Sequence, residues 1–135
     1  MTGLGGGNMN VIARWHDYVA QGDPVLLDAL IAEDCVFQSP AVHSPQEGKA
    51  ITLKYLRAAM AVLNSPTFRY LDEWVCETKA VLEFEAEVDG LIVNGVDMIW
   101  WNESGQITRF KVMVRPLKAL NALVARMAAE LQRAG

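Results

Sequence analysis

The chain has 135 residues, of which 52% are hydrophobic and 21% are charged, and its formal net charge is -4. These values are typical of one globular domain and exclude a largely disordered chain. The acidic balance and the absence of a Lys/Arg cluster argue against nucleic acid as a partner.

No apolar run reaches the roughly 20 residues that a membrane span needs. The start of the chain also lacks the basic and apolar regions of a secretory signal. We therefore expect a soluble, cytoplasmic protein that does not bind membranes. In that compartment Cys35 and Cys76 are expected to be free thiols, although a disulfide between them stays open.

The first half of the chain has the periodicity of amphipathic helices. Gly22 is suited to end the first helix, and Asp23 and Pro24 are suited to cap and start the second. Pro40 and Pro45 predict an irregular loop. The expected segments are a flexible N-terminus over residues 1–7, helices over 8–21, 24–31 and 47–63, a short strand over 35–38 and the loop over 39–47.

The second half has the two-residue alternation of strands. Short turns join consecutive strands, which predicts an antiparallel meander. Pro116 ends the sheet, and an amphipathic helix follows. The expected segments are strands over 67–76, 80–88, 91–102 and 107–115 and a helix to about residue 133. Because there is no internal repeat and no linker, residues 8–135 are predicted to form one α+β domain.

A single carboxylate, Asp97, stands in the otherwise largely apolar strand Leu91–Trp101. A buried charge costs several kcal/mol unless it is paired, hydrogen-bonded or protonated. Such carboxylates occur mostly where a site needs a tuned acid or a hydrogen-bond donor. Alternatively, Asp97 faces water between two core residues.

The order of these elements resembles the NTF2-like superfamily, and most closely its SnoaL-like and ketosteroid-isomerase-like branch. The resemblance covers Val11 to Arg115. Its carriers are Gly22-Asp23, Phe37-Gln38-Ser39-Pro40 with Pro45 and Gly48, and Val96-Asp97-Met98-Ile99-Trp100-Trp101 followed by Gly105. It implies an NTF2-like α+β cone, in which N-terminal helices close over a curved antiparallel sheet, with an additional C-terminal helix.

In ketosteroid isomerases the concave pocket holds a carboxylate base, a tyrosine and a protonated aspartic acid. The resemblance places Asp97 at the acid, Trp15 at the tyrosine and Ser39 at the base. A serine hydroxyl is no base near neutral pH, and an indole donates one weak N–H. The sequence therefore predicts that the usual ketosteroid isomerase chemistry is absent. Epoxide hydrolases of this fold use an Asp-Arg-Asp arrangement and its dehydratases use a histidine pair, and the chain matches neither pattern.

Asp97 and His43 are the expected catalytic residues. His43 lies in the loop at the mouth of the cone and suits proton transfer near neutral pH, unless it simply faces water. The expected ligand-binding residues, each of which could instead be plain core, are Trp15, Phe37, Ser39, Tyr55, Met60, Phe84, Ile99, Trp101, Phe110 and Val112. No cofactor is expected, and no metal, because two distant histidines and scattered acids lack ligand spacing.

If Asp97 faces inward, its strand neighbours face outward. This alternation predicts an apolar patch formed by Val96, Met98, Trp100 and Met113. Such a patch suggests a homodimer through the sheet face, which is usual in the superfamily, unless the C-terminal helix covers it. Acidic residues of one subunit (Glu83, Glu85 and Glu87) would then meet Lys111 and Arg115 of the other near the rim.

Three function classes remain open. The first is a small-molecule enzyme of the isomerase, cyclase or hydrolase type, acting on an apolar carbonyl-bearing or polyketide-like compound in the cone. The second is a non-catalytic binder of an apolar ligand, and the third is a dimeric protein-interaction module. For either of the first two, Asp97 is expected within reach of Trp15 or His43. Its pKa is expected well above about 3.9, because Lys111 and Arg115 alternate to the other side of the sheet.

Overall fold

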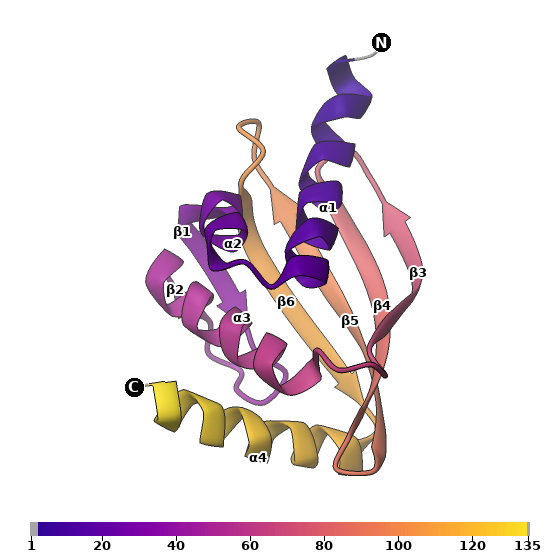
Figure 1. Ribbon diagram of the computed structural model, residues 1–135. Helices are drawn as coiled ribbons and strands as arrows, with labels where there is room; N and C mark the ends of the chain where they lie inside the picture. The colour runs from indigo at the N-terminus through magenta and orange to yellow at the C-terminus, as the bar shows by residue number, and fades with distance from the viewer. Residues whose placement is uncertain (1–2, 135) are drawn as a thin grey trace.

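The computed structural model describes residues 3–134 (Figure 1). The elements run in the order α1 (Gly3–Gln21), α2 (Pro24–Leu30), β1 (Ile31–Gln38), β2 (Gln46–Glu47), α3 (Lys49–Leu63), β3 (Arg69–Val75), β4 (Lys79–Val88), β5 (Leu91–Trp101), β6 (Ile107–Arg115) and α4 (Leu117–Ala134).

The predicted helices and strands are present, most of them with ends shifted by one or two residues and with larger shifts at α1 and β1. β2 lies in the segment that was predicted as an irregular loop, because its two residues pair with β1. α1 begins at Gly3 rather than Asn8, although glycine, which recurs in this segment, disfavours a helix interior. The predicted flexibility of residues 1–7 stays a prediction, and residues 1 and 2 lie outside the described residues. Ile31, predicted as the last apolar residue of a helix, instead opens β1 and pairs with Ile107 of β6. Pairing within the sheet here overrides the helical pattern.

The six strands form one sheet in the order β2-β1-β6-β5-β4-β3. Strands β3 to β6 form the predicted antiparallel meander. β1 pairs parallel to β6, so the sheet is mixed and not antiparallel throughout. Tight turns between consecutive strands indicate the meander in the sequence. The parallel pair of β1 and β6 has no such local signal, because a long stretch of chain separates the two strands.

The helices lie on one side of this curved sheet, which gives the cone that the resemblance implies (Figure 1). α1, α2 and α3 lie over the sheet, and α4 crosses the lower end in this view. α4 packs against α3 and against β4, β5 and β6. It therefore closes one end of the concave side and is not a cover for the outer face.

Buried apolar side chains form two clusters. The larger draws on α1, α2, α3 and the sheet, and among the described residues it contains none from α4. The smaller contains Ala119 and Leu123 of α4 with Phe84 and two valines of the sheet. Full burial of a phenylalanine such as Phe37 or Phe84 stabilises the fold by roughly 1.5–3 kcal/mol.

Gly95 is required by a close approach between β5 and its neighbours. A Cβ at this position would lie 2.6 Å from the backbone oxygen of Met113 and 2.6 Å from Cζ of Phe84. The ring of Phe84 thus fills the space beside Gly95, on the same face of β5 as Asp97. This arrangement helps to shape the interior next to the buried acid.

The state of the two cysteines and the expected absence of a membrane span can also be compared with the structure. Cys35 is buried, Cys76 is exposed, and both are free thiols. Among residues 3–134, no helix combines the length and the apolar character that a bilayer crossing requires.

Candidate functional site

A cavity of about 200 Å³ lies between the helices and the concave face of the sheet. Its wall is almost wholly apolar. Eight of the ten predicted ligand-binding residues line it: Trp15, Phe37, Ser39, Tyr55, Met60, Phe84, Phe110 and Val112. At these eight positions the side chains border a cavity, whereas the sequence left open whether they were plain core.

Ile99 and Trp101 do not line the cavity. Both are buried, as the alternation of β5 requires, but they belong to the larger cluster. In this part of the cone the two side chains pack as core with residues of the helices.

Asp97 lies on the concave face and lines the cavity, with 7% of its surface exposed. Its neighbours on the adjacent strands are Leu82 and Val112. The Tyr70 hydroxyl donates a hydrogen bond to Asp97 Oδ2 at 2.8 Å, and the Trp15 indole N–H donates to the Tyr70 oxygen at 2.9 Å. Trp15 thus reaches Asp97 only through Tyr70.

The second carboxylate oxygen, Asp97 Oδ1, receives no hydrogen bond from the residues that the structure describes. Because the side chain lines the cavity, this oxygen is the one available to a ligand. A protonated carboxyl can donate from it, and an ionised carboxylate can accept a proton on it.

Burial raises the pKa of Asp97 from its ordinary value of 3.8 to about 7, and the hydrogen bond from Tyr70 acts in the opposite direction. Burial and the charge of Asp97 also raise the pKa of Tyr70 well above 10. No lysine, arginine or histidine lines the cavity among the described residues. The direction agrees with the raised pKa expected for Asp97, and a pKa of about 7 gives the acid both of its forms near neutral pH.

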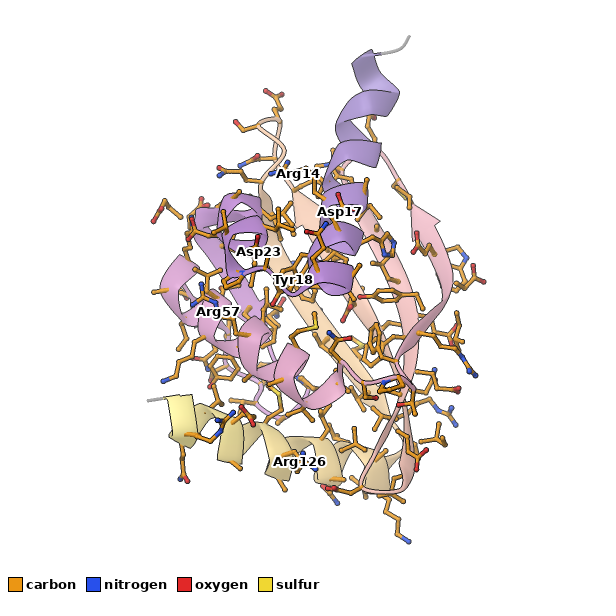
Figure 2. The ribbon with its side chains drawn as sticks, in the orientation of Figure 1. Arg14, Asp17, Tyr18, Asp23, Arg57 and Arg126 are labelled. Carbon is orange, nitrogen blue, oxygen red and sulfur yellow. The ribbon has the colours of Figure 1, made fainter. Side chains whose placement is uncertain are left out.

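The charged side chains of the helices lie away from the cavity. Figure 2 labels Arg14, Asp17, Asp23, Arg57 and Arg126, and none of these five lines it. Arg126 instead pairs with Asp89 in the turn after β4, at 2.7 Å. Among the described residues, α1, α3 and α4 therefore place no cation beside Asp97.

His43 is exposed and does not line the cavity. The mouth loop contributes Ser39 to Val42 instead. The Ser39 hydroxyl accepts a hydrogen bond from the Ala41 N–H at 2.9 Å, which forms a local turn. The structure thus does not bring His43 to Asp97: His43 faces solvent, which is the alternative that the sequence left open.

Tyr70 is the functional residue that sequence reasoning missed. Strand β3 is exposed at every residue except Tyr70, so its sequence shows no alternation. A register shift between Tyr70 and Asp72 further hides which residues face inward. The signal that remains is the chemistry of a tyrosine, which needs a partner for its hydroxyl when it is buried.

α4 also contributes more to the cavity than predicted. Its apolar side was expected to face inward, but not to form a wall of the ligand site. The lining residues from this helix are Leu123, Val124, Met127, Ala128 and Leu131. No group of three or more His, Cys, Asp or Glu side chains suited to a metal occurs within the described part of the chain.

The chain is similar to several known proteins. The sequence profile described as the SnoaL-like domain matches residues 12–110. A steroid delta-isomerase from Pseudomonas aeruginosa is 32% identical, with 95% of this chain and 93% of that one covered and a TM-score of 0.89. An uncharacterized bacterial protein with a cystatin-like fold, from Silicibacter pomeroyi DSS-3, is 36% identical over 91% of this chain and 86% of that one, with a TM-score of 0.83.

A more distant structure shares the fold alone. The epoxide hydrolase/cyclase-like enzyme SalBIII, described as acting in pyran ring formation in the polyether salinomycin, is 17% identical. It covers 80% of this chain and 90% of its own, with a TM-score of 0.65. No curated protein matches the chain. The SnoaL-like profile spans most of the sequence, and the fold is the NTF2-like cone, so the chain belongs to the SnoaL-like family of the NTF2-like superfamily.

Proposed function

We propose that the protein is a small-molecule enzyme of the isomerase-like type, in which Asp97 transfers protons to and from an apolar, carbonyl-bearing or polyketide-like compound. The observation that carries this proposal is a buried acid with a pKa of about 7 and a free oxygen in an apolar cavity. General acid–base groups are most effective when their pKa lies near the working pH. The similarity to a protein described as a steroid delta-isomerase supports the same reaction class.

The reaction that suits one such group is proton transfer next to a carbonyl. The ionised form of Asp97 removes a proton from the carbon beside the carbonyl, whose oxygen takes up the electron pair. The neutral form then returns the proton to carbon. Ser39 lines the mouth but is no base, so we propose that the usual ketosteroid isomerase chemistry, with its additional carboxylate, is not used.

The size of the cavity limits the substrate. At about 200 Å³ it is smaller than the roughly 300–1,000 Å³ of common ligand sites. We therefore expect either a compact substrate or one whose remaining part extends past the mouth loop. The almost uniformly apolar wall favours an uncharged molecule.

A panel assay with purified protein tests this function. The panel contains small cyclic ketones, enones, β-diketones, epoxides and one β,γ-unsaturated steroid ketone, each followed by proton NMR in heavy water. We expect deuterium to enter the carbon beside a carbonyl, or a double bond to move, in at least one compact ketone. The steroid should react no more than in trace amounts, because the base worth roughly 10²–10⁴-fold is missing. Efficient conversion of the steroid would contradict the proposal that the usual ketosteroid isomerase chemistry is not used.

The alternative is a non-catalytic binder, and the apolar wall with a single acid also favours it. In that case ketones of the panel bind, as isothermal titration calorimetry would detect, yet none exchanges its protons faster than in buffer. Binding without exchange would replace the enzyme proposal with this second function.

We also propose that the protein forms a homodimer through the outer face of the sheet. Met113 on this face is 50% exposed, and Trp74 of β3, which the sequence analysis did not include, is 53% exposed. Trp74 and Met98 flank Val81 in the register of the sheet, so the patch extends across three strands. Val81 and the predicted members Val96, Met98 and Trp100 are half-buried within it. Exposed apolar area that continues over several strands is typical of a partner surface.

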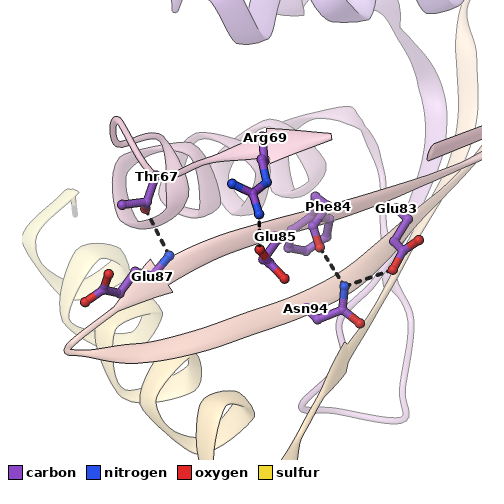
Figure 3. Close-up of polar contacts among 7 residues, drawn as sticks. All are labelled: Thr67, Arg69, Glu83, Phe84, Glu85, Glu87 and Asn94. Atoms are coloured by element: carbon purple, nitrogen blue, oxygen red, sulfur yellow. Dashed lines mark hydrogen bonds and ion pairs between the residues drawn. The ribbon is translucent and has the colours of Figure 1, made fainter. Parts of the chain in front are cut away.

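Two of the three acidic residues of this face, Glu83 and Glu85, already have side-chain partners within the chain. Figure 3 shows Asn94 donating to Glu83 and Arg69 paired with Glu85. The proposed pairing of these carboxylates with basic residues of β6 in a second subunit would compete with those bonds. The apolar patch, rather than the charges, would therefore supply most of the affinity.

Light scattering at micromolar concentration tests the dimer. We expect twice the chain mass of 14.9 kDa for the native protein, and the single-chain mass for Met113→Glu, which places a charge in the patch. Val25→Glu is the matched control, because Val25 is 71% exposed but lies on α2, away from the sheet face. A native mass of one chain would refute the dimer.

A further inference from the structure

Tyr70 differs from the other residues of β3 in its burial. β3 is an edge strand, and Tyr70 is its one residue that is not exposed. Its ring meets His16 edge-on at 5.2 Å and Phe68 edge-on at 5.1 Å. With Trp15 on its oxygen as well, the side chain is held from several sides.

The donor and acceptor groups of Trp15, Tyr70 and Asp97 fix the direction of the two hydrogen bonds that join them. An indole N–H only donates, so the Tyr70 oxygen is the acceptor from Trp15. The single proton of the Tyr70 hydroxyl is therefore the one directed at Asp97 Oδ2. Oδ2 acts as an acceptor in both forms of the acid. When Asp97 is protonated, the bond from Tyr70 favours the proton on Oδ1, the oxygen that receives no hydrogen bond from any described residue.

We propose that Tyr70, held by Trp15, is the positioning residue that turns the proton of Asp97 toward the cavity, so that the site selects an uncharged apolar ligand carrying a hydrogen-bond acceptor. The inference rests on the proposed role of Asp97. It adds that Tyr70 orients the acid, and that the ligand presents a hydrogen-bond acceptor to Asp97.

Few other titratable groups lie beside the three hydrogen-bonded side chains Trp15, Tyr70 and Asp97. His16 of α1 and Glu73 of β3 pair with each other at 2.5 Å beside Tyr70. Tyr55 of α3 lines the same cavity. In the described residues, β1, β4, β6 and α4 contribute no ionisable side chain to the wall around Asp97. The hydrogen bond from Tyr70 is therefore the main polar influence on the acid, and its loss should be visible in the titration of Asp97.

The first test follows the Asp97 carboxyl by carbon-13 NMR in ligand-free protein. Tyr70→Phe keeps the ring and removes only the hydroxyl. Because the lost bond favours the ionised form, we expect Asp97 to titrate about one pH unit higher, a roughly tenfold change in its ionisation constant. Trp15→Phe should give a smaller shift in the same direction. The double variant should shift no further than Tyr70→Phe alone, because Trp15 acts through Tyr70.

The control is Tyr18→Phe, since Tyr18 is buried beside Trp15 but does not line the cavity. Its Asp97 titration should match that of the native protein. An unchanged titration in Tyr70→Phe, or additive shifts in the double variant, would overturn the inference.

The second test measures binding of the bicyclic ketone 2-decalone by calorimetry at a pH where Asp97 is neutral in every variant. We expect Tyr70→Phe to bind it several-fold more weakly than the native protein, because the acid proton is no longer directed at the ligand. Equal affinity would overturn the orienting role. If instead the titration shifts as expected but no ketone is turned over by the native protein, the proposed enzyme function fails and the role of Tyr70 in orienting the acid stands.

Discussion

Asp97→Asn is expected to reduce turnover of a carbonyl substrate by roughly 10²–10⁴-fold, the usual contribution of general acid–base catalysis, while leaving binding of that substrate nearly intact. The amide oxygen can still accept the hydrogen bond from Tyr70, and the amide nitrogen can still donate toward the cavity. What the amide cannot do is carry a proton to or from carbon. The measurement is a comparison of turnover with calorimetric affinity for the same ketone.

Asp72→Asn is the matched control for this substitution, because Asp72 is an exposed aspartate of β3 that does not line the cavity. It should retain full turnover. If Asp97→Asn kept native turnover, proton transfer by Asp97 would be refuted, whereas a parallel loss of binding and turnover would point to a role in binding alone.

The same substitution is expected to stabilise the protein at alkaline pH. The pKa of Asp97 is about 7 in the folded protein against an ordinary 3.8, so the folded state binds the proton more tightly than the unfolded state. The stability that this proton provides is complete below about pH 4 and is lost as pH rises through about 7. At pH 8 we therefore expect Asp97→Asn to raise the free energy of unfolding by about 2–4 kcal/mol.

Urea denaturation at about pH 5 and about pH 8 measures this effect. From the lower to the higher pH, the free energy of unfolding of the native protein should fall. That of Asp97→Asn should change much less. Asp72→Asn again serves as the control and should follow the native protein. A cost of several kcal/mol for Asp97→Asn at pH 8 would instead identify Asp97 as a paired structural charge.

Strand alternation and the family resemblance together predicted Asp97 on the concave face, where it lies. The lone carboxylate by itself left two orientations open, because a strand turns alternate residues to opposite sides. The resemblance added Trp15 and Ser39, and both line the cavity. Local patterns succeed here because the meander is built from neighbouring segments.

The remaining parts depend on contacts between distant segments. Tyr70 reaches Asp97 because β3 pairs with β4 through a register shift that its exposed sequence does not announce. The parallel pairing of β1 with β6 joins segments far apart in the chain. His43 was expected at the site from its place in the mouth loop and its chemistry, but a loop pattern does not show which side chains point inward, and His43 is exposed.

The division of the interior into two clusters separates the evolution of ligand preference from the maintenance of the fold. α4 supplies part of the cavity wall but takes no part in the larger cluster among the described residues. Val124, Ala128 and Leu131 line the cavity and are not buried. Relatives could exchange these three side chains for larger or smaller ones, and so acquire new substrates, while Asp97, Tyr70 and most of the core remain unchanged.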